Sequence, residues 1–158
     1  MRFPRHLKNE KGQAIVEFSL VAVFLVLLVI AFIELIFLVY TYIMLADSAK
    51  EGVRYAIVHG NENATPSGPI GPGAVAAPNA PCTTDSGNVT AVKTAVTNYS
   101  GSSGHAIATG NIKVCYSDGD NLPTHRVTVA VTYPYQAFFG LGWPTVNVHA
   151  EAEGRIVF

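Results

Sequence analysis

The sequence predicts an α+β protein in which a long N-terminal transmembrane helix continues into a small extracytoplasmic head. The head has a second helix and an antiparallel sheet of about three strands. The transmembrane helix is predicted by the stretch from Phe18 to Ile33, which has no charged residue, and by apolar residues that continue to Ala46. This exceeds the roughly 20 residues with which a helix crosses a bilayer. The sheet is predicted by three segments in the last third of the chain where apolar and polar residues alternate.

Charge is segregated along the chain and predicts how it crosses the membrane. The first 12 residues contain four basic residues and one acidic residue, whereas the remainder contains six basic and ten acidic residues. By the positive-inside rule, we expect residues 1–12 to form a cytoplasmic basic leader and the protein to cross the cytoplasmic membrane once, with its C-terminus outside. The apolar run is longer than the roughly 7 to 15 residues of a cleaved secretory signal, so it should stay in the membrane and contact lipid. A mildly acidic exported part argues against nucleic acid as a partner.

The helix is expected to extend over residues 13–60, because the apolar residues that follow the membrane segment keep a helical period. At 1.5 Å per residue it would be on the order of 70 Å long, about twice the hydrocarbon core, so its second half must pack against protein. Ser48, Gly52 and Ala56 place a small residue at every fourth position. Two alternatives are open for them: packing on the protein's own head, or contact with another subunit. Gly60 is expected to end the helix as a C′ glycine.

Residues 61–158 are expected to form the extracytoplasmic α+β head. It begins with a Pro/Gly-rich loop, 65–81, which we expect to lie on the surface and to bury little side chain. A second helix follows, with Asn88 as its N-cap and Gly101 at its end. Its predicted buried face consists of Val89, Val92, Val96 and Tyr99.

Three strands are predicted from alternation, and their apolar face should pack on the second half of the long helix. The residues expected to face inward are Ile112, Val114 and Tyr116, then Val127, Val129, Val131 and Tyr133, then Val146, Val148, Ala150 and Ala152. Ser117 to Asn121 suits a turn between antiparallel strands. The aromatic segment between the last two strands contains Phe138, Phe139, Leu141 and Trp143. We expect these side chains to belong to the core rather than to an exposed contact surface.

Two cysteines, Cys82 and Cys115, both fall in the exported part. Because an oxidising compartment lets such thiols pair, we predict a disulfide between them; two free buried thiols are the alternative. Neither cysteine has the spacing of a redox pair or of a metal site, so no metal site is expected.

Glu17 is the most informative residue for function, because a carboxylate in a membrane segment costs about 2.5 to 3.5 kcal/mol on insertion scales. The segment from Lys11 to Phe18 resembles the recognition motif of prepilin peptidase: a glycine, four residues, a glutamate and an aromatic before a long apolar helix. The resemblance implies cleavage between Gly12 and Gln13. The new amino terminus of a neighbouring subunit would then neutralise Glu17 during assembly. Alternatively, Glu17 lies at the headgroup level and marks the start of the helix.

The resemblance extends to a family. Gly12 to Phe18 and Ala49 to Ala56 resemble the two blocks that flank the helix in TadE-like proteins, minor pilins or pseudopilins of tight-adherence pili. Glu34 resembles an acidic residue frequent at this depth in that family, with a subunit contact or exposure at the outer interface as its two options. The chain departs from the family pattern at Val23, where the family often has proline, and at Ile36, near a common glycine.

No catalytic motif is present: the four histidines of the predicted head and helix end are scattered, and no nucleophile elbow, metal-protease or phosphate-loop pattern occurs. We therefore expect no enzyme activity and no cofactor. The resemblance implies a structural or assembly component of a bacterial tight-adherence type IV pilus, whose partners are prepilin peptidase, other pilins, inner-membrane assembly proteins and membrane lipid. It also implies incorporation into an extracellular pilus as one destination. The alternative is an uncleaved, membrane-anchored binding module or adhesin.

Overall fold

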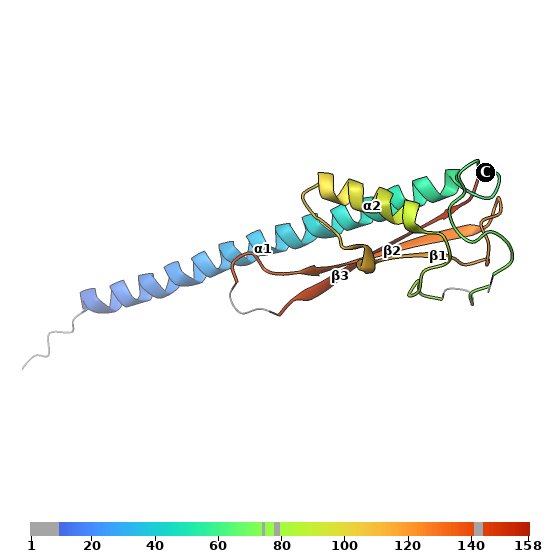
Figure 1. The fold of residues 1–158 in the computed structure, drawn as a ribbon. Coiled ribbons are helices and arrows are strands. Elements are labelled where there is room, and N and C mark those ends of the chain that lie inside the picture. Colours follow the sequence, from blue (N-terminus) through green and yellow to red (C-terminus); the bar gives the residue numbers. More distant parts are fainter. Residues whose placement is uncertain (1–9, 74, 78–79, 141–143) are drawn as a thin grey trace, which may run out of the picture. The chain divides into compact units, whose positions relative to one another are not determined.

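A computed structural model describes residues 10–73, 75–77, 80–140 and 144–158. It contains two α-helices, a short 3-10 turn and a three-stranded sheet within that part of the chain (Figure 1), which confirms the predicted α+β fold. The elements are α1 (Glu10–Val58), α2 (Thr90–Ser102), the 3-10 turn η1 (Thr109–Asn111), β1 (Ile112–Tyr116), β2 (Arg126–Tyr135) and β3 (Val146–Arg155). The chain divides into two compact units, Met1–Phe37 and Leu38–Phe158. The basic leader lies mostly outside the described residues.

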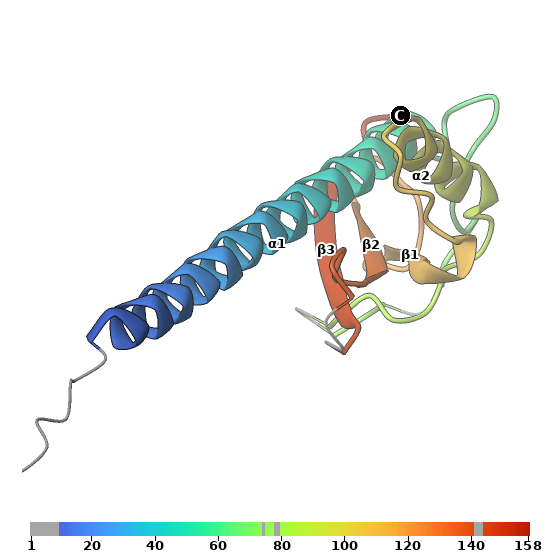
Figure 2. The same ribbon diagram turned by 90° about the vertical axis from the view of Figure 1, so that its left-hand side faces the viewer.

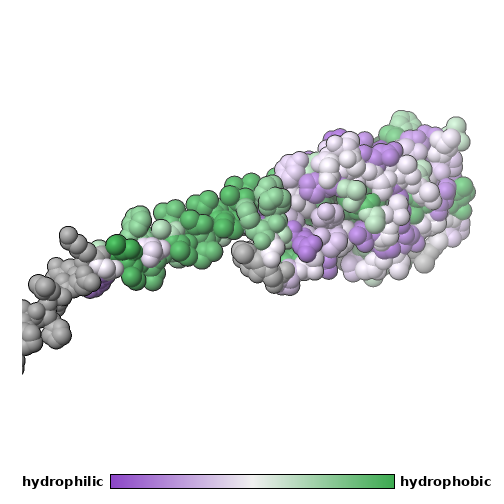
Figure 3. All heavy atoms as spheres, turned by 60° about the vertical axis from the view of Figure 1, so that its left-hand side comes forward, coloured by the Kyte–Doolittle hydropathy of each residue, from purple (hydrophilic) through white to green (hydrophobic). Residues whose placement is uncertain are grey.

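The first unit is a helix whose side chains are apolar and exposed. Hydrophobic residues dominate its visible surface in Figure 3, and Phe18, for example, is 75% exposed. The stretch from Gly12 to Val58 is long and apolar enough to cross a membrane. A helix satisfies its own backbone hydrogen bonds, so it can present such a surface to lipid at little cost. The unit is therefore compatible with a single-pass membrane anchor.

The second unit is built on an antiparallel sheet with the strand order β1-β2-β3. Ile112 pairs with Val131 at one end of β1, and Tyr135 pairs with Val146 at one end of β3. Figures 1 and 2 show α2 and the last part of α1 on the same face of this sheet. The predicted inward residues of β1, with Val127, Val129 and Val131 of β2, are buried against these helices. Burial of this shared apolar face is the main stabilising contribution to the unit.

The small residues of α1 allow the close packing of this core. A Cβ atom added to Gly52 would lie 2.5 Å from Val96 Cγ2 of α2, and one added to Gly154 of β3 would lie 2.5 Å from Val53 Cγ1 of α1. Ser48 and Ala56 are also buried. The small residues of α1 therefore pack on the protein's own head, which is the first of the two alternatives.

Two predicted helix ends were assigned to the wrong residues. Gly60 does not have the positive φ of a C′ glycine. Instead, a Cβ atom there would lie 2.0 Å from the backbone oxygen of Phe158, so the glycine permits a close backbone approach. Asn88 is not the N-cap of α2, because the cap position is Val89. Asn88 has φ 56° and donates its side-chain amide to the Pro66 carbonyl.

The Pro/Gly-rich loop buries more than its composition predicts. Ser67 is 1% exposed and its backbone N–H donates to the His59 carbonyl at 2.6 Å. Gly68 has φ +91° and lies against the ring of Tyr116, where a Cβ atom would be 2.3 Å from Cζ. Ser67 and Gly68 thus become part of the interior and fix the path of their neighbours in the loop.

The connection between β2 and β3 departs from the expected core. Phe138 is 74% exposed and Phe139 is 41% exposed, so the expectation that they belong to the core is wrong. Leu141 and Trp143 lie outside the described residues. Val146, predicted to face inward, is 50% exposed at the start of β3.

Candidate functional site

The start of α1 contains Gly12 in a position that does not need a glycine. Gly12 is exposed, a Cβ atom there would meet nothing within 4 Å, and its φ is not positive. Glycine lowers helix stability by about 1 kcal/mol relative to alanine. Within the described residues, neither packing nor backbone conformation requires a glycine at this position.

Glu17 lies one helical turn and a half after Gly12, on a face that it shares with Gln13, Val16 and Leu20. Its side chain is exposed, and in the described part of the chain it makes no hydrogen bond or ion pair. Phe18, the aromatic of the motif, is also exposed. An ionised carboxylate among apolar side chains is costly in a bilayer. This face therefore combines a carboxylate with apolar side chains.

Glu34, the other acid of the apolar stretch, differs from Glu17. It is 4% exposed, so its carboxyl group is shielded where that of Glu17 is open. The structure does not bring the two acids together: they lie 17 positions apart along the same helix.

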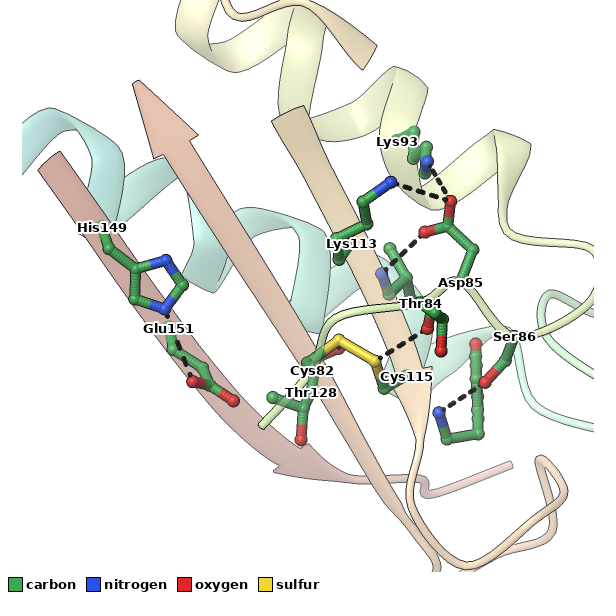
Figure 4. Close-up of a disulfide and its surroundings, with 12 residues drawn as sticks. Cys82, Thr84, Asp85, Ser86, Lys93, Lys113, Cys115, Thr128, His149 and Glu151 are labelled. Atoms are coloured by element: carbon green, nitrogen blue, oxygen red, sulfur yellow. Dashed lines mark hydrogen bonds and ion pairs between the residues drawn. A yellow bond between two sulfur atoms is a disulfide. The ribbon is translucent and has the colours of Figure 1, made fainter. Parts of the chain in front are cut away.

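The predicted disulfide is confirmed. Cys82 and Cys115 are bonded, with their Cα atoms 5.7 Å apart (Figure 4). The bridge holds the segment that follows Cys82 against the outer edge of β1. There the backbone N–H of Val114 donates to Asp85 Oδ1 at 3.1 Å, and that of Tyr116 donates to Ser86 Oγ at 3.0 Å. These two side chains replace a fourth strand, so this edge of the sheet is closed.

Asp85 also organises two cations, as Figure 4 shows. Lys93 of α2 donates to Asp85 Oδ2 at 2.6 Å, and Lys113 Nζ of β1 lies 3.9 Å from the same oxygen. Sequence analysis did not identify Asp85, because its partners are separated from it by loop and helix segments that no local pattern connects. The cluster joins α2, β1 and the loop, and its role is structural.

Asp118 and Arg126 form a second ion pair, at the turn between β1 and β2. Asp118 accepts from Arg126 Nη2 at 2.8 Å, from Nε at 3.2 Å and from the backbone N–H at 2.8 Å. The side-chain hydrogen bonds from Arg126 lower the pKa of Asp118 to about 2. The turn was predicted from Ser117 to Asn121, but its charge pairing was not.

The histidines of the head do not converge. His59 stacks on Tyr55, His125 contacts Asp120, and His149 Nε2 lies 3.7 Å from Glu151 Oε2. Among the described residues, no group of three or more histidine, cysteine, aspartate or glutamate side chains is arranged to hold a metal ion. The candidate functional residues therefore lie in two separate places: the motif at the start of α1 and the disulfide beside the sheet.

Residues 12–54 match the model of a family described as TadE-like protein. The match begins at Gly12 and contains the block from Gly12 to Phe18 and most of the block from Ala49 to Ala56, so the predicted resemblance is confirmed over this part of the chain. The sheet and α2 lie outside it. No similar protein was found among curated proteins or among solved structures.

Proposed function

We propose that this chain is a structural or assembly component, a minor pilin or pseudopilin, of a bacterial tight-adherence type IV pilus. The observation that carries the proposal is the match to the TadE-like family over residues 12–54, which starts at the glycine of the peptidase-like motif. The exposed apolar surface of α1 and the closed, disulfide-bonded head support a role in packing rather than in catalysis.

Processing by prepilin peptidase is the first step of the proposed function. The peptidase would cut between Gly12 and Gln13 on the cytoplasmic side, remove the basic leader and leave a positively charged amino terminus. The exposure of Gly12 and the open space around it support access by an enzyme. A glycine that the fold does not need is accounted for if the peptidase requires it.

The second step is assembly through Glu17. A carboxylate without a partner among the described residues, at the start of a lipid-facing helix, gains most from a cation that lies in the same low-dielectric layer. The new amino terminus of a neighbouring pilin is such a cation. Pairing would fix the axial position of one subunit relative to the next, while the apolar faces of the helices pack together.

The test is a Glu17→Gln substitution in the native bacterium. We expect the variant to enter the membrane normally, since it loses a charge from the bilayer segment, but to reduce the amount of pilus recovered from sheared cells. Glu62→Gln, a charge change on an exposed loop residue of the head, is the control and should leave the pilus unchanged. Normal pilus formation with Glu17→Gln contradicts the pairing. Normal pilus formation in a strain that lacks the whole chain favours the membrane-anchored binding module instead.

A further inference from the structure

The outer face of the sheet, opposite the helices, carries a small polar pocket. It has a volume of about 300 Å³ and lies between β2, β3 and the loop that leads to Cys82. Its lining includes Thr128 of β2, Glu151 and Glu153 of β3, and Ala77 and Pro81 of the loop. The volume is at the lower limit for small-molecule sites, so the pocket suits one small ligand or a single side chain.

Strand register places the polar groups of the pocket on one side of the sheet. Thr128 pairs with both Cys115 and Glu153, so these three side chains form a row across the strands. Figure 4 shows Thr128 and Glu151 on neighbouring strands beside the disulfide. Glu151 and Glu153 are two residues apart on β3, so their side chains lie on the same face of the sheet. The rise of a strand places their Cα atoms about 7 Å apart.

Thr128 contributes a hydroxyl group to the lining of the pocket. It is only 5% exposed, yet within the described chain its hydroxyl group makes no hydrogen bond. Among the described residues, the fully buried side-chain polar atom without a partner is Asn121 Oδ1 rather than the Thr128 hydroxyl, so this hydroxyl remains accessible, and Thr128 lines the pocket. Its oxygen has lone pairs that can accept from a ligand placed there.

The charges around the pocket favour a cationic ligand. Arg126, the basic residue that lines it, is already held by Asp118 through two side-chain hydrogen bonds. Lys113, on the same face, lies beside Asp85. Glu153, in contrast, forms no hydrogen bond or ion pair with any described residue, and Glu151 has only the contact with His149. The described lining therefore has two carboxylates against one guanidinium, a net charge of -1, and the Arg126 charge acts on Glu153 as well as on Asp118.

Other ligand classes fit less well. An anion would meet two carboxylates and an arginine that is already paired. The pocket lacks the aromatic side chain on which sugars commonly stack, as far as its described lining goes. A metal ion would find no third ligand of the usual kind among the described residues. Ala77 and Pro81 provide apolar contact for an aliphatic chain that ends in a charged head.

From these observations we infer that the pocket binds an ammonium or guanidinium group, as carried by a lysine or arginine side chain of a partner polypeptide or by a free small amine. Glu151 and Glu153 accept hydrogen bonds from the charged head, the hydroxyl of Thr128 supplies a further acceptor, and the loop wall contacts the aliphatic stem. This site lies on the head and does not depend on processing at Gly12 or on Glu17, so it can fail while the proposed function holds.

The experiment uses the full ¹⁵N-labelled chain in detergent micelles at constant ionic strength. N-acetyl-lysine methylamide and putrescine are titrated separately, with calcium chloride and sodium acetate as counter-probes, and amide shifts are followed by NMR. We expect saturable shifts at Thr128, Glu151 and Glu153 with an amine probe and none with acetate. Tighter binding of the lysine probe supports a polypeptide ligand, and tighter binding of putrescine supports a free amine.

Matched variants separate a specific site from general charge attraction. Glu153→Gln should weaken amine binding by about tenfold, as expected for loss of a hydrogen bond to a charged group, whereas Glu62→Gln removes the same charge elsewhere and should change nothing. Thr128→Val should also weaken binding while keeping the shape of the side chain. The inference is overturned by an absence of saturable shifts, by equal weakening in Glu62→Gln, or by calcium binding in place of the amines.

Discussion

Gly52 of α1 and Val96 of α2 approach so closely that a Cβ atom at Gly52 would lie 2.5 Å from Val96 Cγ2. The same Cβ would lie 3.2 Å from Val129 Cγ1 of β2, so α1, α2 and the sheet meet at this one glycine. The contact fixes the second half of α1 to the head.

Gly52→Ala should destabilise the head. Overpacking of a close-packed core costs about 1 to 3 kcal/mol, which exceeds the gain of about 1 kcal/mol from alanine in a helix. Urea unfolding of the full chain in micelles, followed by near-ultraviolet circular dichroism of the tyrosines, measures the change. The control is Gly101→Ala in α2, where a Cβ atom meets nothing within 4 Å. That variant should be as stable as the wild type or slightly more so, and an equally stable Gly52→Ala would show that the core can adjust at this point.

Removal of the disulfide should lower the free energy of unfolding of the head by about 3 to 4 kcal/mol, because Cys82 and Cys115 close a long loop in the unfolded chain. The double variant Cys82→Ser, Cys115→Ser is compared with the wild type before and after reduction. Reductant should destabilise the wild type to the level of the double variant and leave the double variant unchanged. A wild type that is insensitive to complete reduction would contradict this account.

Acid should weaken the turn between β1 and β2 through Asp118. Arg126 lowers the pKa of Asp118 from 3.8 to about 2 in the folded chain. The folded protein therefore holds this proton less tightly than the unfolded chain, so the stabilisation is complete above pH about 4 and is lost as pH falls towards 2. Urea midpoints at these two pH values should differ more for the wild type than for Asp118→Asn. Identical pH dependence in the two proteins would rule out the pairing as a source of stability.

Alkali should act through Tyr116. Its phenol is 3% exposed, and burial raises its pKa above the ordinary 10.0, although the hydrogen bond with Ser67 partly offsets this. The stabilisation is complete below pH 10 and is lost as pH rises through the higher folded pKa. In a spectrophotometric titration, one tyrosine should ionise later than the others and together with unfolding. Tyr116→Phe should remove that late step; its persistence would assign the step to another tyrosine.

The fold was predictable where a local pattern decides it. Alternation of apolar and polar residues located all three strands. In β1 and β2, the residues that face the helices are apolar in the sequence and buried in the structure. The presence of two cysteines in the exported part predicted the disulfide, and the apolar run predicted the long helix α1.

The remainder depended on contacts between distant segments. Gly60 was interpreted from the helix that precedes it, whereas the reason for the glycine is the backbone of Phe158 at the other end of the chain. Asn88 was interpreted as a helix cap, whereas its side-chain amide donates a hydrogen bond to the Pro66 carbonyl of the loop. The polar row of Thr128 and Glu153 could not be seen without the register that pairs them. A one-dimensional pattern gives the face of a strand but not what the loops place over it.

The central claim is that the chain is a prepilin-like precursor cut after Gly12, and the amino-terminal sequence of the protein tests it most directly. The protein is purified from its native membrane, in strains with and without prepilin peptidase. The account predicts a mature chain that starts at Gln13 only when the peptidase is present. An intact segment from Met1 to Gly12 in both strains would contradict it and would favour a permanently anchored binding protein.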